Sequence, residues 1–237
     1  MKIVLTCLLC SISYLVSSQD TKTQPVDTLL IPKFLDEIVI SANKIPEPRR
    51  NVAQQILVMS EPVIKNMNAQ TTAELIANSG TVAMQKSQQG GGSPMLRGFE
   101  ASRVLLVVDG VRMNNLIYRS GHLQNLITTD NNTLARAEIL LGPSSTVYGS
   151  DALGGVIHLH TKEPQLATDD ELNYAMNAFF RYGSVNNEKT SHLDIQLGGK
   201  KFGSFTSFTF SVFDDLKMGE KINPSWGESF GERPQYV

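Results

Sequence analysis

The two stretches of sequence that decide the fold are PMLRGFEASRVLLVVDGVRMNN, residues 94–115, and LARAEILLGPSSTVYGSDALGGVIHLHTK, residues 134–162. In the first, five consecutive apolar residues, Val104–Val108, predict a strand buried on both faces, and the Asp109-Gly110 pair predicts a tight turn after it. In the second, residues 134–141 and 156–161 predict two more strands, separated by a turn or a single helical turn. These three short strands predict one compact sheet.

Helix signals lie upstream of these strands. Residues 56–59 predict a short strand, and Ser60 followed by Pro62 predicts the start of a helix directly after it. Thr71 and Glu74 have the spacing of a capping box, which predicts the start of a second helix. Short helices between strands predict an α+β domain.

Residues 173–212 show a different pattern, in which apolar and polar residues alternate. Apolar residues occupy the even positions from Tyr174 to Tyr182, whereas Asn177 and Arg181 lie on the opposite face. Two further alternating segments follow, separated by turns. This is the dyad pattern of transmembrane barrel strands. A soluble antiparallel sheet with one buried face has the same pattern, and the pattern taken alone favours that soluble sheet.

The composition limits the classes of function. The 237 residues are 41% hydrophobic and 19% charged, which suffices for a packed core. The net charge of −2 gives no broad basic surface, so we expect no nucleic-acid partner. Lys2 followed by the mostly apolar residues 3–16 predicts an export signal peptide over residues 1–18. The only two cysteines, Cys7 and Cys10, lie in this signal, so we expect a mature protein without disulfides.

The two quoted stretches, together with LDEIVISA at residues 35–42, resemble the family of TonB-dependent outer-membrane receptors. The resemblance covers residues 35–165. It implies an α+β plug domain, with a mixed sheet and short helices, followed by antiparallel transmembrane β-barrel strands, the barrel being incomplete in this chain. The domains it implies are a signal peptide (1–18), a flexible lead with the TonB box (19–50), the plug (51–165) and the first barrel strands (166–237).

The resemblance also implies a function. Proteins of this family actively import a scarce nutrient complex across the outer membrane of a Gram-negative bacterium. Because the substrate crosses unchanged, the chain is not expected to be an enzyme or to hold a resident cofactor. The implied partners are a TonB-type energising protein in the periplasm, outer-membrane lipid and the nutrient complex. An iron–siderophore complex or haem is the favoured substrate, and cobalamin is the alternative.

The resemblance implies a short extended TonB box that pairs with the energising protein by strand addition. We expect it to have no partner within the chain. It comprises Asp36, Glu37, Ile38, Val39, Ile40, Ser41 and Ala42.

Substrate contacts are expected on two polar loops at the apex of the plug. The glycines of the first loop allow close backbone approach, and the aromatic and basic residues of the second offer stacking, charge and ligation. His122 is the proposed ligand of haem iron, and its plainer interpretation is an ordinary surface histidine. The candidate residues are Gln88, Gln89, Tyr118, Arg119, His122 and Gln124.

The resemblance further implies arginines that pair with barrel glutamates and hold the plug in place. Arg97 matches such a position, and Arg136 and Glu138 are additional candidates for this lock. The chain departs from the family pattern at Ala135 and Leu141, so a complete lock is not expected.

Two histidines, His158 and His160, share one face of a predicted strand. That spacing can bind a metal ion. Because no third ligand is identified, we expect a structural role for both histidines and predict no metal site there.

Two alternatives stay open at this point. One is a soluble exported α+β binding module with no transport role. The other is an exported hydrolase built on His122, Ser144 and Asp151, although the sequence contains neither a G-x-S-x-G elbow nor an H-E-x-x-H helix. A plugged barrel has about 22 strands, and residues 166–237 supply only three. The sequence therefore predicts a piece of a longer protein.

Overall fold

The computed structural model describes residues 38–86, 91–113, 125–168, 171–217 and 232–233. Its central element is a five-stranded sheet in the order β3-β8-β9-β6-β7. The strands are β3 (Gln55–Ser60), β6 (Val104–Val108), β7 (Val111–Arg112), β8 (Leu134–Leu141) and β9 (Gly155–Thr161). The pair β6–β9 is parallel and the other pairs are antiparallel, so the sheet is mixed, as predicted.

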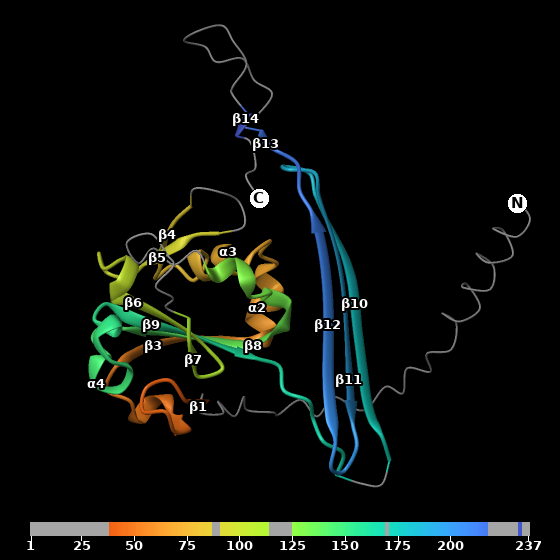
Figure 1. Cartoon of the computed structure of the whole chain (residues 1–237), viewed down its shortest axis with the longest axis horizontal. Helices are drawn as coiled ribbons and strands as arrows, with labels where there is room; N and C mark the ends of the chain where they lie inside the picture. Colours follow the sequence, from red (N-terminus) through yellow and green to blue (C-terminus); the bar gives the residue numbers. More distant parts are fainter. Residues whose placement is uncertain (1–37, 87–90, 114–124, 169–170, 218–231, 234–237) are drawn as a thin grey trace, which may run out of the picture. The chain divides into compact units, whose positions relative to one another are not determined.

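Apolar side chains cover both faces of this sheet. On one face, α2 (Glu61–Met67) and α3 (Thr72–Ala77) pack through Ile64, Leu75 and Ile76 against residues such as Leu106 and Ile139. On the other face, β1 (Ile38–Val39) and α4 (Ser145–Tyr148) pack against Leu105, Val107 and Leu140. Figure 1 shows the two helices on one side of the sheet and β1 with α4 on the other. This burial on both faces explains why β6 is apolar at every position.

The predicted helix starts and the tight turn are confirmed, although the Ser60 side chain makes no cap hydrogen bond and the Glu74 carboxylate accepts from Gln70 N. Pro62 lies in the first turn of α2, where its missing N–H has no intrahelical role. The hydroxyl of Thr71 accepts a hydrogen bond from Glu74 N and caps α3. Asp109 and Gly110 both have positive φ, 47° and 83°, as the tight turn between β6 and β7 requires.

The remaining short elements lie at the edges of these layers. A two-stranded sheet pairs β4 (Ala83–Gln85) with β5 (Ser93–Met95), and another pairs β13 (Leu216–Lys217) with β14 (Glu232–Arg233). Single 3-10 turns are η1 (Arg49–Asn51), η2 (Ala101–Arg103), η4 (Asn125–Thr128), η5 (Asn131–Thr133) and η6 (Ser150–Ala152).

Part of the predicted flexible lead is ordered. Residues 38–51 form β1, β2 (Glu47–Pro48) and η1, and β1 pairs with β2 in an antiparallel ladder of two residue pairs. The proline at position 48 is accommodated because it lies in a short ladder at the edge of the domain.

A separate antiparallel sheet of three long strands follows the plug. Its strands are β10 (Asn173–Gly183), β11 (Glu188–Gly198) and β12 (Gly203–Val212), in the order β10-β11-β12. They contain 11, 11 and 10 residues, which matches the roughly 9–11 residues of a membrane-spanning strand. The predicted meander is therefore confirmed.

The described part of the chain contains no helix long and apolar enough to cross a membrane.

Candidate functional site

The segment 38–42, the described part of the predicted TonB box, is docked on the plug. Val39 is 0% exposed, and Ser41 and Ala42 are buried with it, whereas Ile38 is 52% exposed. The segment pairs with β2 through Ile38 and Val39. The expectation that the box has no partner within the chain is therefore wrong for residues 38–42, because apolar burial and a local ladder hold them. Asp36 and Glu37 lie outside the described residues.

Glu138 on the central strand β8 is the main polar partner of this segment. Its carboxylate accepts hydrogen bonds from Ser41 N at 2.9 Å, from Ile40 N at 3.2 Å and from the Ser41 hydroxyl. Arg136 Nε lies 2.9 Å from the same carboxylate. Glu138 itself is fully buried, so these donors take the place of water around its charge.

The pKa of Glu138 lies below its ordinary value of 4.5. Burial alone would raise it, but the hydrogen bonds from Ser41 and the charge of Arg136 outweigh burial and favour the ionised form. The carboxylate is therefore charged at neutral pH and acts only as an acceptor.

Tyr148 of α4 adds a second tie to the segment. Its hydroxyl donates a 2.7 Å hydrogen bond to the carbonyl oxygen of Ser41. Burial and the nearby Glu138 charge raise the pKa of Tyr148 to about 12, so the hydroxyl keeps its proton. The Lys44 ammonium lies 5.0 Å from the centre of the Tyr148 ring, and this cation–π contact is a further link between the residues after β1 and α4.

The residues predicted to lock the plug to a barrel make contacts within the plug itself. Arg136 and Glu138 pair with each other, and their contacts with barrel residues stay a prediction. Arg97 is exposed, has a positive φ of 50°, and donates a 2.6 Å hydrogen bond to the Gln55 side chain rather than to a carboxylate. Its pairing with a barrel glutamate stays a prediction.

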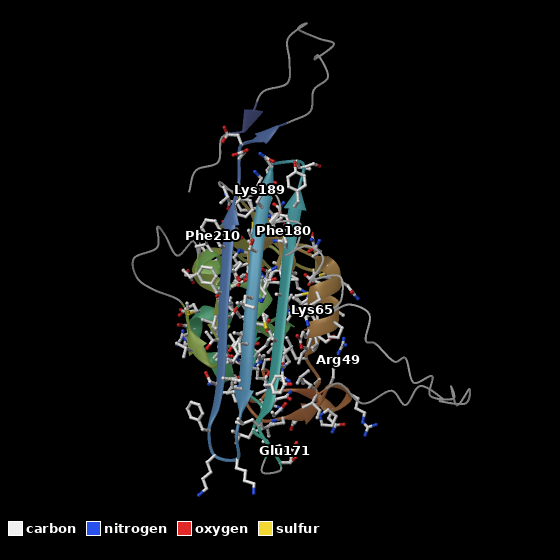
Figure 2. The ribbon with its side chains drawn as sticks, turned by 90° about the vertical axis from the view of Figure 1, so that its right-hand side faces the viewer. Arg49, Lys65, Glu171, Phe180, Lys189 and Phe210 are labelled. Carbon is white, nitrogen blue, oxygen red and sulfur yellow. The ribbon has the colours of Figure 1, made fainter. Side chains whose placement is uncertain are left out.

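The three-stranded sheet has an unusual distribution of polarity. Its buried face carries Glu188, Thr190, His192 and Asp194, which are 1%, 1%, 3% and 7% exposed. Its exposed face carries the large apolar residues Tyr174, Met176, Phe180, Tyr182, Ile195, Leu197, Phe208 and Phe210. Figure 2 looks onto this exposed face, where Phe180 is labelled on β10 and Phe210 on β12, the two outer strands of the sheet. The sheet is inside-out compared with a soluble one.

Polar contacts join the buried face of this sheet to the plug. The Arg181 guanidinium donates hydrogen bonds to Ala69 O at 3.0 Å and to Asn68 Oδ1 at 3.3 Å, and it is paired with Glu188. Gln70 and Asn186 exchange hydrogen bonds through their side-chain amides. Sequence reasoning missed these contacts, because the residues lie about 112 to 116 positions apart.

Two further contacts continue this interface. Lys162 Nζ lies 3.4 Å from both Glu61 and Asp194, and so links α2 to β11. The Thr209 hydroxyl donates a 2.5 Å hydrogen bond to Asp130, and the His192 ring lies within hydrogen-bond distance of the same hydroxyl. Beside these contacts lies a cavity of about 510 Å³ whose lining combines polar residues such as Lys65, Asn131 and Arg181 with apolar ones such as Ile64 and Leu134.

The predicted substrate residues Gln88, Gln89, Tyr118, Arg119, His122 and Gln124 lie outside the described residues, and so does all of their two loops except residues 91–93. Their roles stay predictions. In the sequence, residues 87–90 lie between β4 and β5, and residues 114–124 lie between β7 and η4.

His158 and His160 have structural roles. Their ring centroids lie 4.0 Å apart, His158 Nε2 accepts a hydrogen bond from Gly110 N, and His160 Nε2 lies 3.5 Å from Glu138. Burial, together with the neighbouring His160, lowers the pKa of His158 to about 4, so the ring is neutral. Within the described ranges no group of three or more His, Cys, Asp or Glu residues could hold a metal ion.

Ser144 does not resemble a hydrolytic nucleophile. Its hydroxyl accepts a 2.7 Å hydrogen bond from the Gln54 amide, and Asp151 pairs with Arg112 at 2.5 Å. A nucleophilic serine needs an adjacent base that can take its proton. The Gln54 amide cannot act as this base, and Asp151 is paired with Arg112. The contacts of Ser144 and Asp151 therefore do not support the hydrolase alternative.

Comparison with known proteins identifies related sequences. Residues 48–156 match the family model described as TonB-dependent Receptor Plug Domain. Two proteins of Vibrio vulnificus, each named vitamin B12 transporter BtuB, are 30% identical to the chain over 98% and 97% of its length. The chain spans 35% and 39% of the length of these two relatives, so it corresponds to little more than a third of each.

Solved structures share the fold at lower identity. FpvA of P. aeruginosa bound to a pyoverdine–iron complex has a TM-score of 0.62 at 17% identity, covering 76% of this chain and 22% of that one. The copper transporter OprC has a TM-score of 0.59 at 20% identity, covering 68% and 24%. The alcaligin receptor FauA of Bordetella pertussis has a TM-score of 0.58 at 17% identity, covering 76% and 29%. These likenesses show a common arrangement of plug and following strands.

Proposed function

We propose that this protein, whose residues 48–156 match the TonB-dependent Receptor Plug Domain model, is an outer-membrane receptor that gates the active import of a metal-bearing nutrient complex across the outer membrane of a Gram-negative bacterium. The plug is the gate. Strands β10–β12 are the first wall of the surrounding barrel, and residues 38–42 are the end of the segment that a periplasmic energising protein engages.

The inside-out sheet is the observation that carries this proposal. A soluble sheet buries its apolar face, since each Å² of apolar surface removed from water contributes about 25 cal/mol. Here the polar face packs on the plug and the apolar face, with Phe180 67% exposed, points away from it. Lipid is the solvent that such a face requires. The soluble binding module predicts the opposite orientation of the two faces.

Transport requires a plug that is held firmly and can still move. The contacts of Arg181, Lys162 and Gln70 with the plug are polar and can be replaced by water, which makes them suitable for a reversible interface. The plug's own sheet is instead held by apolar packing on both faces. The proposal is that energy-driven movement acts at the polar interface before it disturbs the core.

Cobalamin and iron complexes are the two candidate substrates. The two relatives at 30% identity are named vitamin B12 transporters, which favours cobalamin. FpvA and FauA are named for pyoverdine and alcaligin, and they share only the fold. Haem import rests on the prediction for His122.

Uptake by whole cells tests the proposal. The receptor is expressed in a strain that lacks its own cobalamin, haem and siderophore receptors, and uptake of labelled cyanocobalamin, haem and a ferric siderophore is measured with and without an uncoupler. We expect accumulation of one compound that the uncoupler and deletion of the energising protein both abolish. Energy-independent uptake, or uptake of none of the three metal complexes by a correctly inserted receptor, would contradict the proposal.

A further inference from the structure

The docked segment and Glu138 are the basis of a further inference, which rests on the proposed function. Glu138 lies at the middle of β8, a strand paired on both sides, by β3 and β9. Its carboxylate binds a segment that lies 97 and 98 positions earlier in the chain. Because this fully buried carboxylate accepts its hydrogen bonds from a segment that is distant in sequence, it fixes the position of that segment.

The bonds of Glu138 use the backbone groups that strand addition needs. A partner strand pairs through the N–H and C=O groups of the segment that it captures. The N–H groups of Ile40 and Ser41 both donate to Glu138, and the Ser41 carbonyl accepts from Tyr148. While these bonds are closed, a partner strand has no access to those three groups.

The carboxylate also keeps a partner when the segment leaves. Arg136 Nε lies 2.9 Å from the Glu138 carboxylate. The Arg136 side chain is partly exposed, so water can reach one member of this ion pair. A buried carboxylate stripped of every partner would be prohibitively unstable. With Arg136 in place, the bonds to Ser41 and Ile40 can open and close again, as a latch requires.

We propose that Glu138, with Tyr148, forms a clamp that competes with the strand of the periplasmic partner for the backbone of residues 40 and 41. Glu138 is a positioning residue in this scheme. The partner reaches the exposed Ile38 first, and pairing continues past Val39 only when the clamp opens. The closed clamp thereby lowers the apparent affinity of the partner by the fraction of time that it stays closed.

Cysteine labelling of the whole receptor in outer-membrane vesicles tests the clamp. Val39→Cys reports undocking because Val39 is 0% exposed, and Ile38→Cys is its matched control because Ile38 is 52% exposed. The only natural cysteines lie in the predicted signal peptide, so the background is low. We expect Glu138→Gln to raise the maleimide labelling rate at position 39 about tenfold and Tyr148→Phe to raise it about threefold to fivefold. Labelling at position 38 changes less than twofold.

A binding measurement completes the test. The purified periplasmic domain of the TonB-type protein is titrated onto the same vesicles without substrate, and both clamp variants should bind it several-fold more tightly than the wild type. Glu100→Gln is the control, since Glu100 is an exposed carboxylate of the plug that takes no part in the clamp or in the contacts with the three-stranded sheet. It should leave labelling and binding unchanged.

Two results would overturn the clamp. One is an unchanged labelling rate at position 39 in Tyr148→Phe, a variant that keeps the ring and is expected to fold even if Glu138→Gln does not. The other is equal partner affinity in the wild type and in every folded clamp variant. Failure of the proposed function looks different: the wild-type receptor would then not bind the periplasmic domain at all.

Discussion

The guanidinium of Arg181 donates a 3.0 Å hydrogen bond to the carbonyl oxygen of Ala69, and so joins strand β10 to the loop that follows helix α2. Arg181 lies on the polar face of its strand, next to outward-facing Phe180, which is 67% exposed. These two neighbouring residues show the arrangement of the whole sheet: the polar face packs on the plug, and the apolar face, which we propose to meet lipid, points away from it.

Loss of Arg181 should loosen the plug at this point. Arg181→Gln leaves the Glu188 carboxylate buried without its ion-pair partner, which we expect to cost about 3 kcal/mol of local stability. Hydrogen exchange at residues 68–70 in the whole receptor should accelerate by about a hundredfold. Lys189→Gln, an exposed change on the neighbouring strand, is the control and should leave this exchange unaltered. Equal exchange in the two variants would refute the tie between Arg181 and the plug.

A charge on the outer face should impair membrane insertion. Phe180→Lys places an ammonium where we propose lipid, at a cost of about 2 kcal/mol or more, whereas Phe180→Leu keeps the site apolar. The amount of heat-modifiable, folded receptor in outer membranes should fall for the lysine variant and stay near the wild-type amount for the leucine variant. Normal insertion of Phe180→Lys would argue that the face meets water.

A side chain at Gly155 should disrupt the plug's sheet. Gly155 has φ 151°, and a Cβ there would lie 2.4 Å from the Leu140 carbonyl oxygen and 2.8 Å from Leu96. Gly155→Ala should therefore cost about 3 kcal/mol or more, because backbone on β8 must move. Gly80→Ala is the matched control: Gly80 also has positive φ, but nothing lies within 4 Å of the added methyl, so the cost is about 1 kcal/mol. Limited proteolysis of the plug measures both, and similar digestion rates would contradict the expected difference.

The plug should lose stability on mild acidification. His158 is neutral in the folded protein because its pKa is lowered to about 4, whereas an unfolded histidine has its ordinary value of 6.5. The unfolded state thus binds the proton first as the pH falls. The contribution of His158 to the free energy of unfolding is therefore fully present above pH 6.5. It is lost as the pH falls from 6.5 to about 4, which lowers the free energy of unfolding by roughly 2 to 3 kcal/mol.

Hydrogen exchange in β8 and β9, corrected for the pH dependence of the intrinsic rate, measures this decline. His158→Gln keeps a hydrogen-bond acceptor near Gly110 N without a titrating ring, so its decline should be smaller. An identical pH dependence in the wild type and in this variant would show that His158 is not responsible.

Much of the plug could be predicted from local sequence. The apolar run Val104–Val108 predicts a strand, Thr71 and Glu74 predict a helix start, and Asp109-Gly110 predicts a tight turn; all three are confirmed. These signals work because each depends on residues a few positions apart.

The candidate site could not be predicted in the same way. The period of two in residues 173–212 is identical for a soluble sheet and for an inside-out one, and only the position of the plug shows which face is buried. Glu138 contacts Ser41 across 97 positions, and no local pattern signals such a bond. The hydrogen bond from Arg97 to Gln55 spans 42 positions and is equally invisible to local patterns.

The orientation of the two faces of β10 is the most direct test of the account. Nitroxide labels are introduced one at a time at residues 176–181 of the receptor in outer-membrane vesicles, and their collision rates with lipid-soluble oxygen and a water-soluble nickel chelate are measured. We predict a period of two, with high oxygen and low nickel accessibility at Met176 and Phe180, and the lowest oxygen accessibility at Asn177 and Arg181. The opposite phase, or nickel accessibility at Met176 and Phe180 equal to that of a label in water, would contradict the claim that this strand separates a plug from lipid.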